Sequence, residues 1–199
     1  MIRAATISDA GSITSVQIEA WVAAYKHFMP EEFLRSLSVS DRSQRWEELL
    51  SQDSEQIWVY LASDSIRGFV HYRCVQNDDG EKLGEIERLY VHPQDWGAGI
   101  GLELMDYAIR ELRSGGTSGV SLWVAEENPR ARRFYESRGF QLGQLRRVNR
   151  FSIDGRHLPP DELPTPGAIP NSTIGEFVEI DYHLKWKSED NNSFSERKI

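Results

Sequence analysis

A short glycine-rich segment between a strand and a helix constrains this chain more than any other feature. Residues 83–91 have the apolar character of a strand that breaks at Pro93, and glycines follow at 97, 99 and 101. From Ile100 to about Ser114 the apolar residues recur every three or four positions, which is the spacing of an amphipathic helix. Glycines at this spacing let the backbone turn its N–H groups toward one point, at the positive end of the helix. The segment therefore predicts a site for a diphosphate.

A tight turn without any ligand is the alternative for the same glycines. Among nucleotide-binding folds, a Walker loop ends in Gly-Lys-Ser/Thr, and Gly101-Leu102-Glu103 lacks that ending. The Rossmann fingerprint follows the first strand of a parallel βαβ unit. Here the loop follows the fourth strand of a series that we expect to be mainly antiparallel. Both nucleotide-binding folds are therefore disfavoured.

The periodicities along the chain predict a mixed α/β protein with one β-helix-β-helix passage near its middle. Strands are expected at 2–5, 56–62, 66–75, 83–91, 119–125, 141–153 and 176–186, and helices before Pro30, around 33–37, after Ser40, at 100–114 and at 129–138. Residues 154–175 hold five of the eight prolines and predict an irregular insertion. We expect a single domain over 1–186 that includes this insertion, followed by a flexible tail at 187–199.

Charge and cysteine content exclude several classes of protein. The net charge of −8 argues against a nucleic-acid partner and against an anionic membrane surface, and it favours a cationic partner. The single cysteine, Cys74, excludes an internal disulfide and a cysteine metal cluster, and no metal is expected. Cys74 itself is expected to be a small buried strand residue. The apolar runs are too short to span a bilayer and the start lacks a signal-peptide pattern, so a cytoplasmic location is expected.

Together with two further stretches, the glycine loop resembles the GNAT-type N-acetyltransferase superfamily. The acyl-CoA motif of that family is Arg or Gln, two residues, Gly, one residue, then Gly or Ala. Gly99 and Gly101 match its last two places, and Trp96 stands where Arg or Gln is usual. The other matching stretches are Ile2-Arg3-Ala4-Ala5-Thr6 with Asp9-Ala10, and Asn128, Ala131, Phe134-Tyr135-Glu136 and Arg138-Gly139-Phe140. The resemblance covers roughly residues 1–153 and the last strand.

The resemblance implies an α+β fold, in which helices flank a central, twisted, mostly antiparallel sheet that is splayed at the acyl-CoA site. It implies transfer of an acetyl group from acetyl-CoA to a primary amine by direct attack in a ternary complex. The acceptor is expected to be a small cationic amine or a peptide amine. An acyl-CoA-binding regulatory protein without turnover and a toxin that acetylates charged tRNA are the alternatives. The chain could also form a homodimer.

The resemblance also assigns residues to the co-substrate. The backbone at Leu89 and Val91 is expected to bond pantetheine, which is compatible with core side chains at the same positions. The backbone amides of the loop are expected to bind the diphosphate, although Trp96 lacks one side-chain contact to phosphate. Asn128 is expected to bond pantetheine, to cap the helix that begins at Pro129, or to do both. The full expected set is Leu89, Tyr90, Val91, Trp96, Gly97, Ala98, Gly99, Ile100, Gly101, Leu102, Asn128 and Tyr135.

Tyr135 occupies the position of the tyrosine that protonates the departing CoA thiolate in such enzymes; the alternative is a core aromatic. The acceptor amine must lose a proton, and at pH 7 the neutral form of an amine of pKa about 10.4 costs about 4.6 kcal/mol. A carboxylate can take that proton. Glu85 and Glu87 are expected to point to the same face of their strand, with Glu85 as the preferred base. The alternative is two solvated carboxylates.

Three residues are candidates for the acceptor site. Trp21 and Tyr25 lie one helical turn apart and could hold a cation, although core packing is the more frequent reason for such a pair. Glu87 is the third candidate. Arg130, Arg132 and Arg133 could reach the 3′-phosphate of CoA or could form a solvated helix face, and His92 receives no role.

Overall fold

The computed structural model describes residues 1–52, 55–76, 80–152, 157–158 and 173–186. Most of the expected insertion at 154–175 and the whole expected tail at 187–199 lie outside the described residues. Two short parts of the insertion are described, and both are strands, because β7 covers His157–Leu158 and β8 begins at Thr173. The prediction that 154–175 is irregular throughout is therefore wrong at these positions. The high proline content of 154–175 led to a predicted strand start at 176, whereas β8 begins at Thr173 and pairs there with the end of β6.

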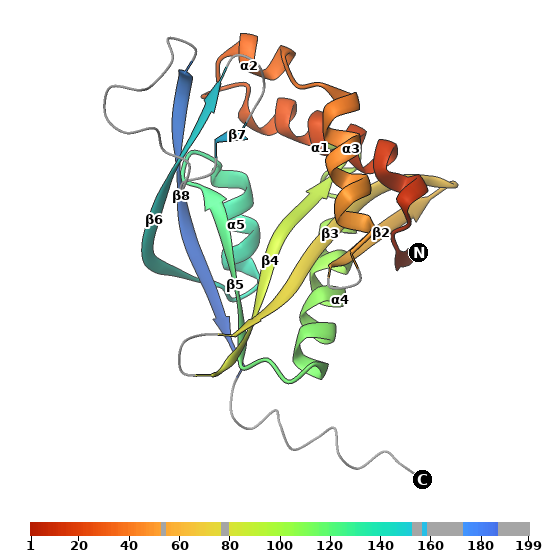
Figure 1. Ribbon diagram of the computed structural model, residues 1–199. Coiled ribbons are helices and arrows are strands. Elements are labelled where there is room, and N and C mark those ends of the chain that lie inside the picture. Colours follow the sequence, from red (N-terminus) through yellow and green to blue (C-terminus); the bar gives the residue numbers. More distant parts are fainter. Residues whose placement is uncertain (53–54, 77–79, 153–156, 159–172, 187–199) are drawn as a thin grey trace.

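Figure 1 shows a twisted sheet with helices on both faces. Within the described residues it has eight strands in the order β1-β2-β3-β4-β5-β8-β6-β7. The strands are β1 Ile2–Ala4, β2 Gln56–Ala62, β3 Ser65–Gln76, β4 Lys82–Val91, β5 Gly119–Ala125, β6 Gln141–Ser152, β7 His157–Leu158 and β8 Thr173–Lys185. The helices are α1 Ala10–Tyr25, α2 Glu31–Arg35, α3 Val39–Leu50, α4 Ile100–Ser114 and α5 Pro129–Ser137, with short 3₁₀ turns η1 Ile7–Asp9 and η2 Pro93–Asp95. The α+β, mostly antiparallel sheet predicted from the sequence is confirmed.

β4 and β5 form a parallel pair only where both strands begin. Their register joins Gly84 to Val120, Glu85 to Ser121 and Ile86 to Leu122, and no later pair follows. Beyond Ile86 the two strands diverge, as the V between them in Figure 1 shows. Each strand is followed by a helix, α4 after β4 and α5 after β5, so the open end of the V lies beside both helix N-termini.

A β-bulge in β4 sets which side chains face each side of the sheet. His71 of β3 pairs with Arg88 and Tyr72 pairs with Ile86, so Glu87 is an extra residue. Ile86 packs in the core beneath α4, and Leu89 packs against the same core. Glu87 and Arg88 consequently both face the opposite side, where α1 and α3 pack.

The two faces of the central strands carry separate hydrophobic cores. On one face Val70 and Ile86 pack against the predicted apolar stripe of α4, in which Leu104, Met105 and Ala108 are fully buried. On the other face Phe69 packs with α1 and α3. Burial of these apolar stripes fixes α1 and α4 on opposite sides of β3 and β4.

Cys74 is exposed, so the prediction of a buried cysteine is wrong. The pairing of β2 with β3 extends only to Tyr72. The last residues of β3, from Arg73 on, therefore extend beyond the end of β2. The sequence pattern marks 74 as a strand position but does not indicate how far the neighbouring elements extend.

Candidate functional site

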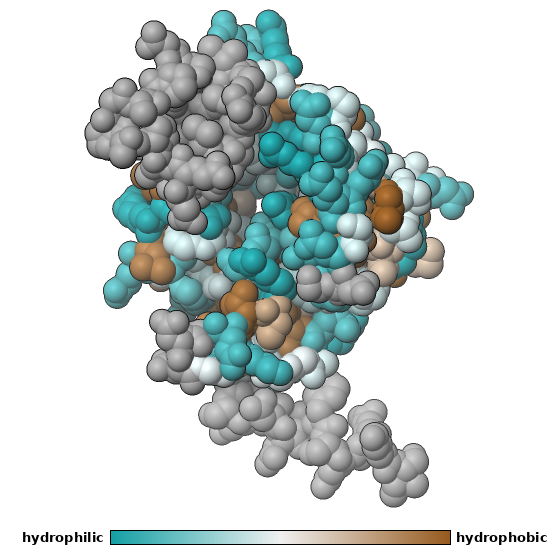
Figure 2. Space-filling view, viewed as in Figure 1, coloured by the Kyte–Doolittle hydropathy of each residue, from teal (hydrophilic) through white to brown (hydrophobic). Residues whose placement is uncertain are grey.

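A cavity of about 820 Å³ lies where β4 and β5 separate. One wall is formed by the second half of β4 and the glycine loop, and the opposite wall by the end of β5 and by α5. The end of α1 and two residues of β6 and β8, Arg147 and Glu179, complete it. Figure 2, seen from the side of α1 and α3, shows the molecule hollowed near the centre of this face, with hydrophilic side chains around the hollow.

The glycine loop turns left-handed twice before α4 begins. Gly97 and Gly99 have φ angles of 90° and 88°, a region that L-residues with side chains rarely adopt. A Cβ atom at either position would meet no atom within 4 Å, so the space beside both glycines is open. The first intrahelical bond runs from Glu103 N to Gly99 O, at 3.0 Å. The N–H groups of Ile100 to Leu102 therefore precede the hydrogen-bonded helix, at its positive end.

The edge of β4 that faces the split carries peptide groups without a strand partner. His92 N donates to Arg67 O on the β3 side, at 2.8 Å. Because successive residues of a strand direct their peptide groups to opposite sides, Leu89 and Val91 direct theirs toward the split. An extended amide-containing chain fits against such an edge as an added strand does.

Trp96 occupies the loop position at which the acyl-CoA motif has Arg or Gln. Its indole Nε1 donates to Val91 O at 2.8 Å, which ties the loop to the edge of β4. The guanidinium carbon of Arg130 lies 3.5 Å from the centroid of the Trp96 ring. A cation from the first turn of α5 therefore lies at the entrance to the glycine loop, held by cation–π contact.

The wall formed by β5 and α5 carries Asn128 and Tyr135. Tyr25 of α1 also lines the cavity. Asn128 caps α5, because its Oδ1 accepts from Ala131 N at 3.1 Å. Tyr135 is 8% exposed, and its hydroxyl has no hydrogen-bond partner among the described residues. Burial raises the pKa of the Tyr135 phenol, and Tyr90 and Glu179 raise it further. Tyr135 is therefore protonated at neutral pH.

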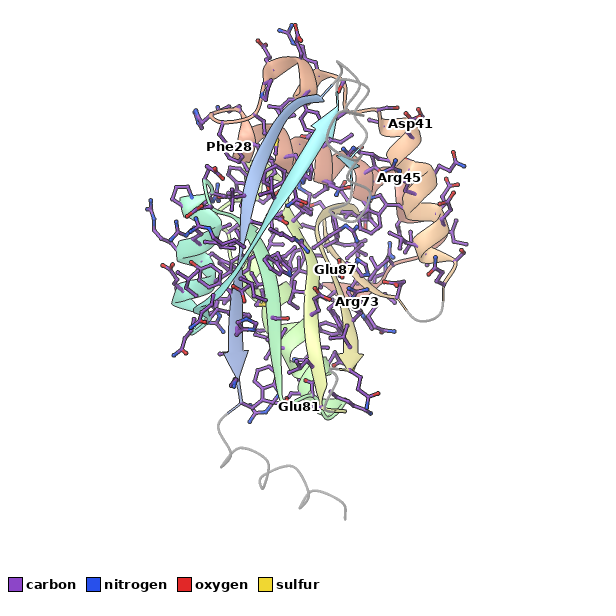
Figure 3. All side chains as sticks on the ribbon, turned by 60° about the vertical axis from the view of Figure 1, so that its left-hand side comes forward. Phe28, Asp41, Arg45, Arg73, Glu81 and Glu87 are labelled. Carbon is purple, nitrogen blue, oxygen red and sulfur yellow. The ribbon has the colours of Figure 1, made fainter. Side chains whose placement is uncertain are left out.

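Glu85 and Glu87 both contact Arg73, each at 2.8 Å. Their side chains share a face, and Figure 3 shows Glu87 and Arg73 together on the sheet. Only Glu87 of the two lines the cavity. Burial raises the pKa of the Glu87 carboxyl, and the charge of Glu85 raises it further, against the opposing effect of Arg73.

The cavity gathers most residues that the sequence assigned to binding or catalysis, but three lie outside its lining: Glu85, Ala98 and Trp21. Trp21 packs with Phe33 in an aromatic cluster below α2, and its Nε1 donates to Tyr90 Oη at 2.6 Å. The predicted residues that do line the cavity are Tyr25, Glu87, Leu89, Tyr90, Val91, Trp96, Gly97, Gly99, Ile100, Gly101, Leu102, Asn128 and Tyr135.

His92, for which no role was predicted, anchors the start of the glycine loop. Its Nδ1 accepts from Gln94 N at 3.2 Å, so the ring proton lies on Nε2, 2.8 Å from Glu19 Oε2. Arg67 Nε contacts Asp95 Oδ2 at 2.7 Å beside it. A histidine next to Pro93, at the end of a strand, was the only sequence signal for this cluster.

A family model described as the acetyltransferase (GNAT) family matches residues 18–140 of the chain. An uncharacterized N-acetyltransferase of Archaeoglobus fulgidus is 32% identical over 124 residues, which cover 60% of this chain and 81% of that protein. A mycothiol acetyltransferase of Nocardiopsis dassonvillei is 30% identical over 155 residues, 74% of this chain. The match spans only 44% of that longer relative.

Solved structures share the fold. The PaiA N-acetyltransferase of Thermoplasma acidophilum, solved in complex with coenzyme A, superposes with a TM-score of 0.69 at 18% identity, covering 94% of this chain and 98% of that one. None of the helices in the described part of the chain is long and apolar enough to cross a membrane.

Proposed function

The chain belongs to the GNAT acetyltransferase family and is an acetyl-CoA-dependent N-acetyltransferase; we propose that it acetylates a primary amine by direct attack in a ternary complex. The acceptor is a small amine or a peptide amine. The observation that carries the proposal is the split between β4 and β5, which opens one cavity to a loop of free amides, to Tyr135 and to Glu87.

Backbone groups bind the co-substrate in this proposal. The N–H groups from Gly97 to Leu102 hold the diphosphate at the N-terminus of α4, apart from that of Ala98, which donates to Asp95 O at 3.1 Å. The pantetheine arm lies along the open edge of β4 at Leu89 and Val91, with the Asn128 side chain on the other side. Support comes from the open space beside Gly97 and Gly99 and from the unpaired edge of β4.

Arg130 supplies the charge that the loop lacks. In the family motif an Arg or Gln side chain stands where this chain has Trp96. The Arg130 guanidinium lies over the Trp96 ring, so a cation from α5 lies beside the diphosphate loop. We expect Arg130 to pair with a phosphate oxygen while it remains stacked on the indole.

Tyr135 is the general acid and Glu87 the base, acting through water. The amine nitrogen bonds to the thioester carbonyl carbon, the C–S bond breaks, and Tyr135 Oη gives its proton to the leaving sulfur. A phenol that burial keeps protonated suits this role. Glu87 is preferred to Glu85 because it lines the cavity and because its raised pKa makes it a stronger base than an ordinary glutamate.

Calorimetric titration with acetyl-CoA, followed by thiol release with a panel of amines, tests the proposal. We expect micromolar binding of acetyl-CoA and weak binding of free adenosine, because the loop recognises the diphosphate. Turnover with an amine supports catalysis. Tight binding without thiol release from any amine would support a regulatory acyl-CoA-binding protein, and absence of binding would contradict the assignment of the loop.

A further inference from the structure

Three arginines without carboxylate partners lie on the α1–α3 side of the sheet, and one of them, Arg88, lines the cavity. Arg42 and Arg45 belong to α3, and Arg88 belongs to β4. Burial lowers the pKa of the Arg42 guanidinium, and the nearby charges of Arg45 and Arg88 lower it further. Within the described part of the chain, no carboxylate forms an ion pair with any of the three. Figure 3 labels Arg45 on α3, on the side of the sheet that carries Glu87.

Arg88 lines the cavity in a fixed orientation. Its Nη1 donates to His71 Nδ1 at 2.7 Å, and its guanidinium carbon lies 5.3 Å from the centroid of the Trp46 ring. Burial and the charge of Arg88 lower the pKa of His71, so the ring is neutral and donates from Nε2 to Glu55. The other N–H groups of Arg88 have no partner among the described residues. They remain available to a ligand.

Arg42 is held beside the same part of β4. Its guanidinium carbon lies 5.1 Å from the centroid of the Trp21 ring, and Trp21 in turn is hydrogen-bonded to Tyr90, which lines the cavity. The Arg42 side chain makes no hydrogen bond within the described residues. A partly buried guanidinium without an anion is costly, which favours a site that an anion completes.

The carboxylates of the neighbouring strands are already paired. Glu85 and Glu87 share Arg73, and Glu179 accepts from Arg147 Nε at 2.6 Å. Glu85, Glu87 and Arg73 together keep one net negative charge, and Glu55 beside the neutral His71 carries another, against the three positive charges of Arg42, Arg45 and Arg88. The local charge is therefore positive, although the whole chain carries −8. At physiological salt a ligand responds mainly to charges within the Debye length of about 8 Å, so the local charge decides.

We propose that Arg42, Arg45 and Arg88 bind an anionic group of the acceptor, a carboxylate or a phosphate, so that the acceptor is a small amine that also carries an anion. Guanidinium groups present N–H donors in a planar fork that fits both anions. The inference rests on the proposed function, because it names the acceptor class for the same cavity. It replaces the cationic amine that the net charge of the chain favours.

Matched amine pairs that differ in the anionic group test the proposal. Suitable probes are lysine against cadaverine, histidine against histamine, and O-phosphoethanolamine against ethanolamine, with spermidine as a polycation. Binding is measured by calorimetry on the complex with CoA, and turnover by thiol release with acetyl-CoA. We expect at least one anionic amine to bind ten times more tightly than its partner. The amino-acid and phosphate pairs distinguish the two anions.

Substitution of the arginines then shows which of them causes the preference for an anionic amine. Arg42→Gln and Arg88→Gln are expected to raise the KM of the anionic amine tenfold or more and to leave acetyl-CoA affinity unchanged. Arg45→Gln, at an exposed position, is expected to have an effect of two- to threefold. Arg110→Gln, on α4 at the opposite face, is the matched control and should change neither constant.

Equal affinity for both members of every pair overturns the proposal, and so does a preference that survives in both Arg42→Gln and Arg88→Gln. A failure of the proposed function is distinguishable from these outcomes. If an anionic amine binds with the expected preference but no thiol is released, the anion site stands and acetyl transfer to that amine is rejected.

Discussion

The two sides of the cavity present different chemical groups, backbone on one side and side chains on the other. The side proposed for the co-substrate presents backbone, namely the amides of the glycine loop and the open edge of β4. The side proposed for the acceptor presents side chains from separate elements, such as Tyr25 of α1, Arg88 of β4 and Arg147 of β6. Backbone recognition depends on a contiguous segment, whereas side-chain recognition depends on tertiary packing. Recognition by backbone can therefore be predicted from a sequence, whereas recognition by side chains that meet only in the fold cannot.

Gly99→Val should have the largest effect on binding and should act on the proposed co-substrate side alone. A β-branched residue is strained at a φ of 88°, and its side chain would enter the open space of the loop. We expect acetyl-CoA affinity to fall by about 100-fold or more, measured by calorimetry, because a helix-end site loses several contacts at once. Circular dichroism checks the fold, and an unchanged dissociation constant in a folded variant would reject the phosphate loop.

Tyr135→Phe tests the catalytic residue at the boundary between the two sides. We expect kcat to fall by about 10² to 10³, the usual range for loss of a general acid, with little change in acetyl-CoA affinity. The ring keeps its contacts with Phe140 and Tyr182, so stability should be preserved. A kcat equal to that of the wild type would remove Tyr135 from the mechanism.

Glu87→Gln should affect the acceptor side, with Glu85→Gln as the matched comparison on the same face. We expect a loss of about 10- to 100-fold in kcat/KM for Glu87→Gln and a smaller loss for Glu85→Gln. A base must be ionised, so the wild-type rate should fall as the pH drops through the Glu87 pKa, which lies above that of an ordinary glutamate. The variant should lose that acidic limb. Retention of the limb in Glu87→Gln would assign the base elsewhere.

Arg130→Ala should have the smallest effect. A partly exposed ion pair between a guanidinium and a phosphate contributes about 0.2–1 kcal/mol, so we expect a weakening of acetyl-CoA binding of about 1.5- to 5-fold, which added salt reduces. Arg110→Ala, exposed on α4 and outside the cavity lining, is the control and should bind acetyl-CoA as the wild type does. Similar affinities for both variants would show that the stacked guanidinium does not contact phosphate.

The sequence predicted the fold class because the strands and helices carry clear periodicities. It indicated the glycine loop because two left-handed turns before an amphipathic helix require glycine at 97 and 99. It did not indicate that Arg130 would stack on Trp96, since the two residues meet only when α5 packs across the split. The bulge at Glu87 was not predicted either, although the two adjacent charged residues Glu87 and Arg88 interrupt the alternation between Ile86 and Leu89.

The same bulge makes β4 respond differently to substitution and to deletion. Substitutions at 87 and 88 alter side chains that face α1 and α3, while Leu89 and Val91 keep their peptide groups toward the split. Deletion of one codon there would restore regular alternation and turn every later side chain to the other face. Substitutions at 87 and 88 are therefore expected to alter the proposed acceptor side alone, whereas insertions and deletions in β4 are expected to disrupt both proposed sites at once.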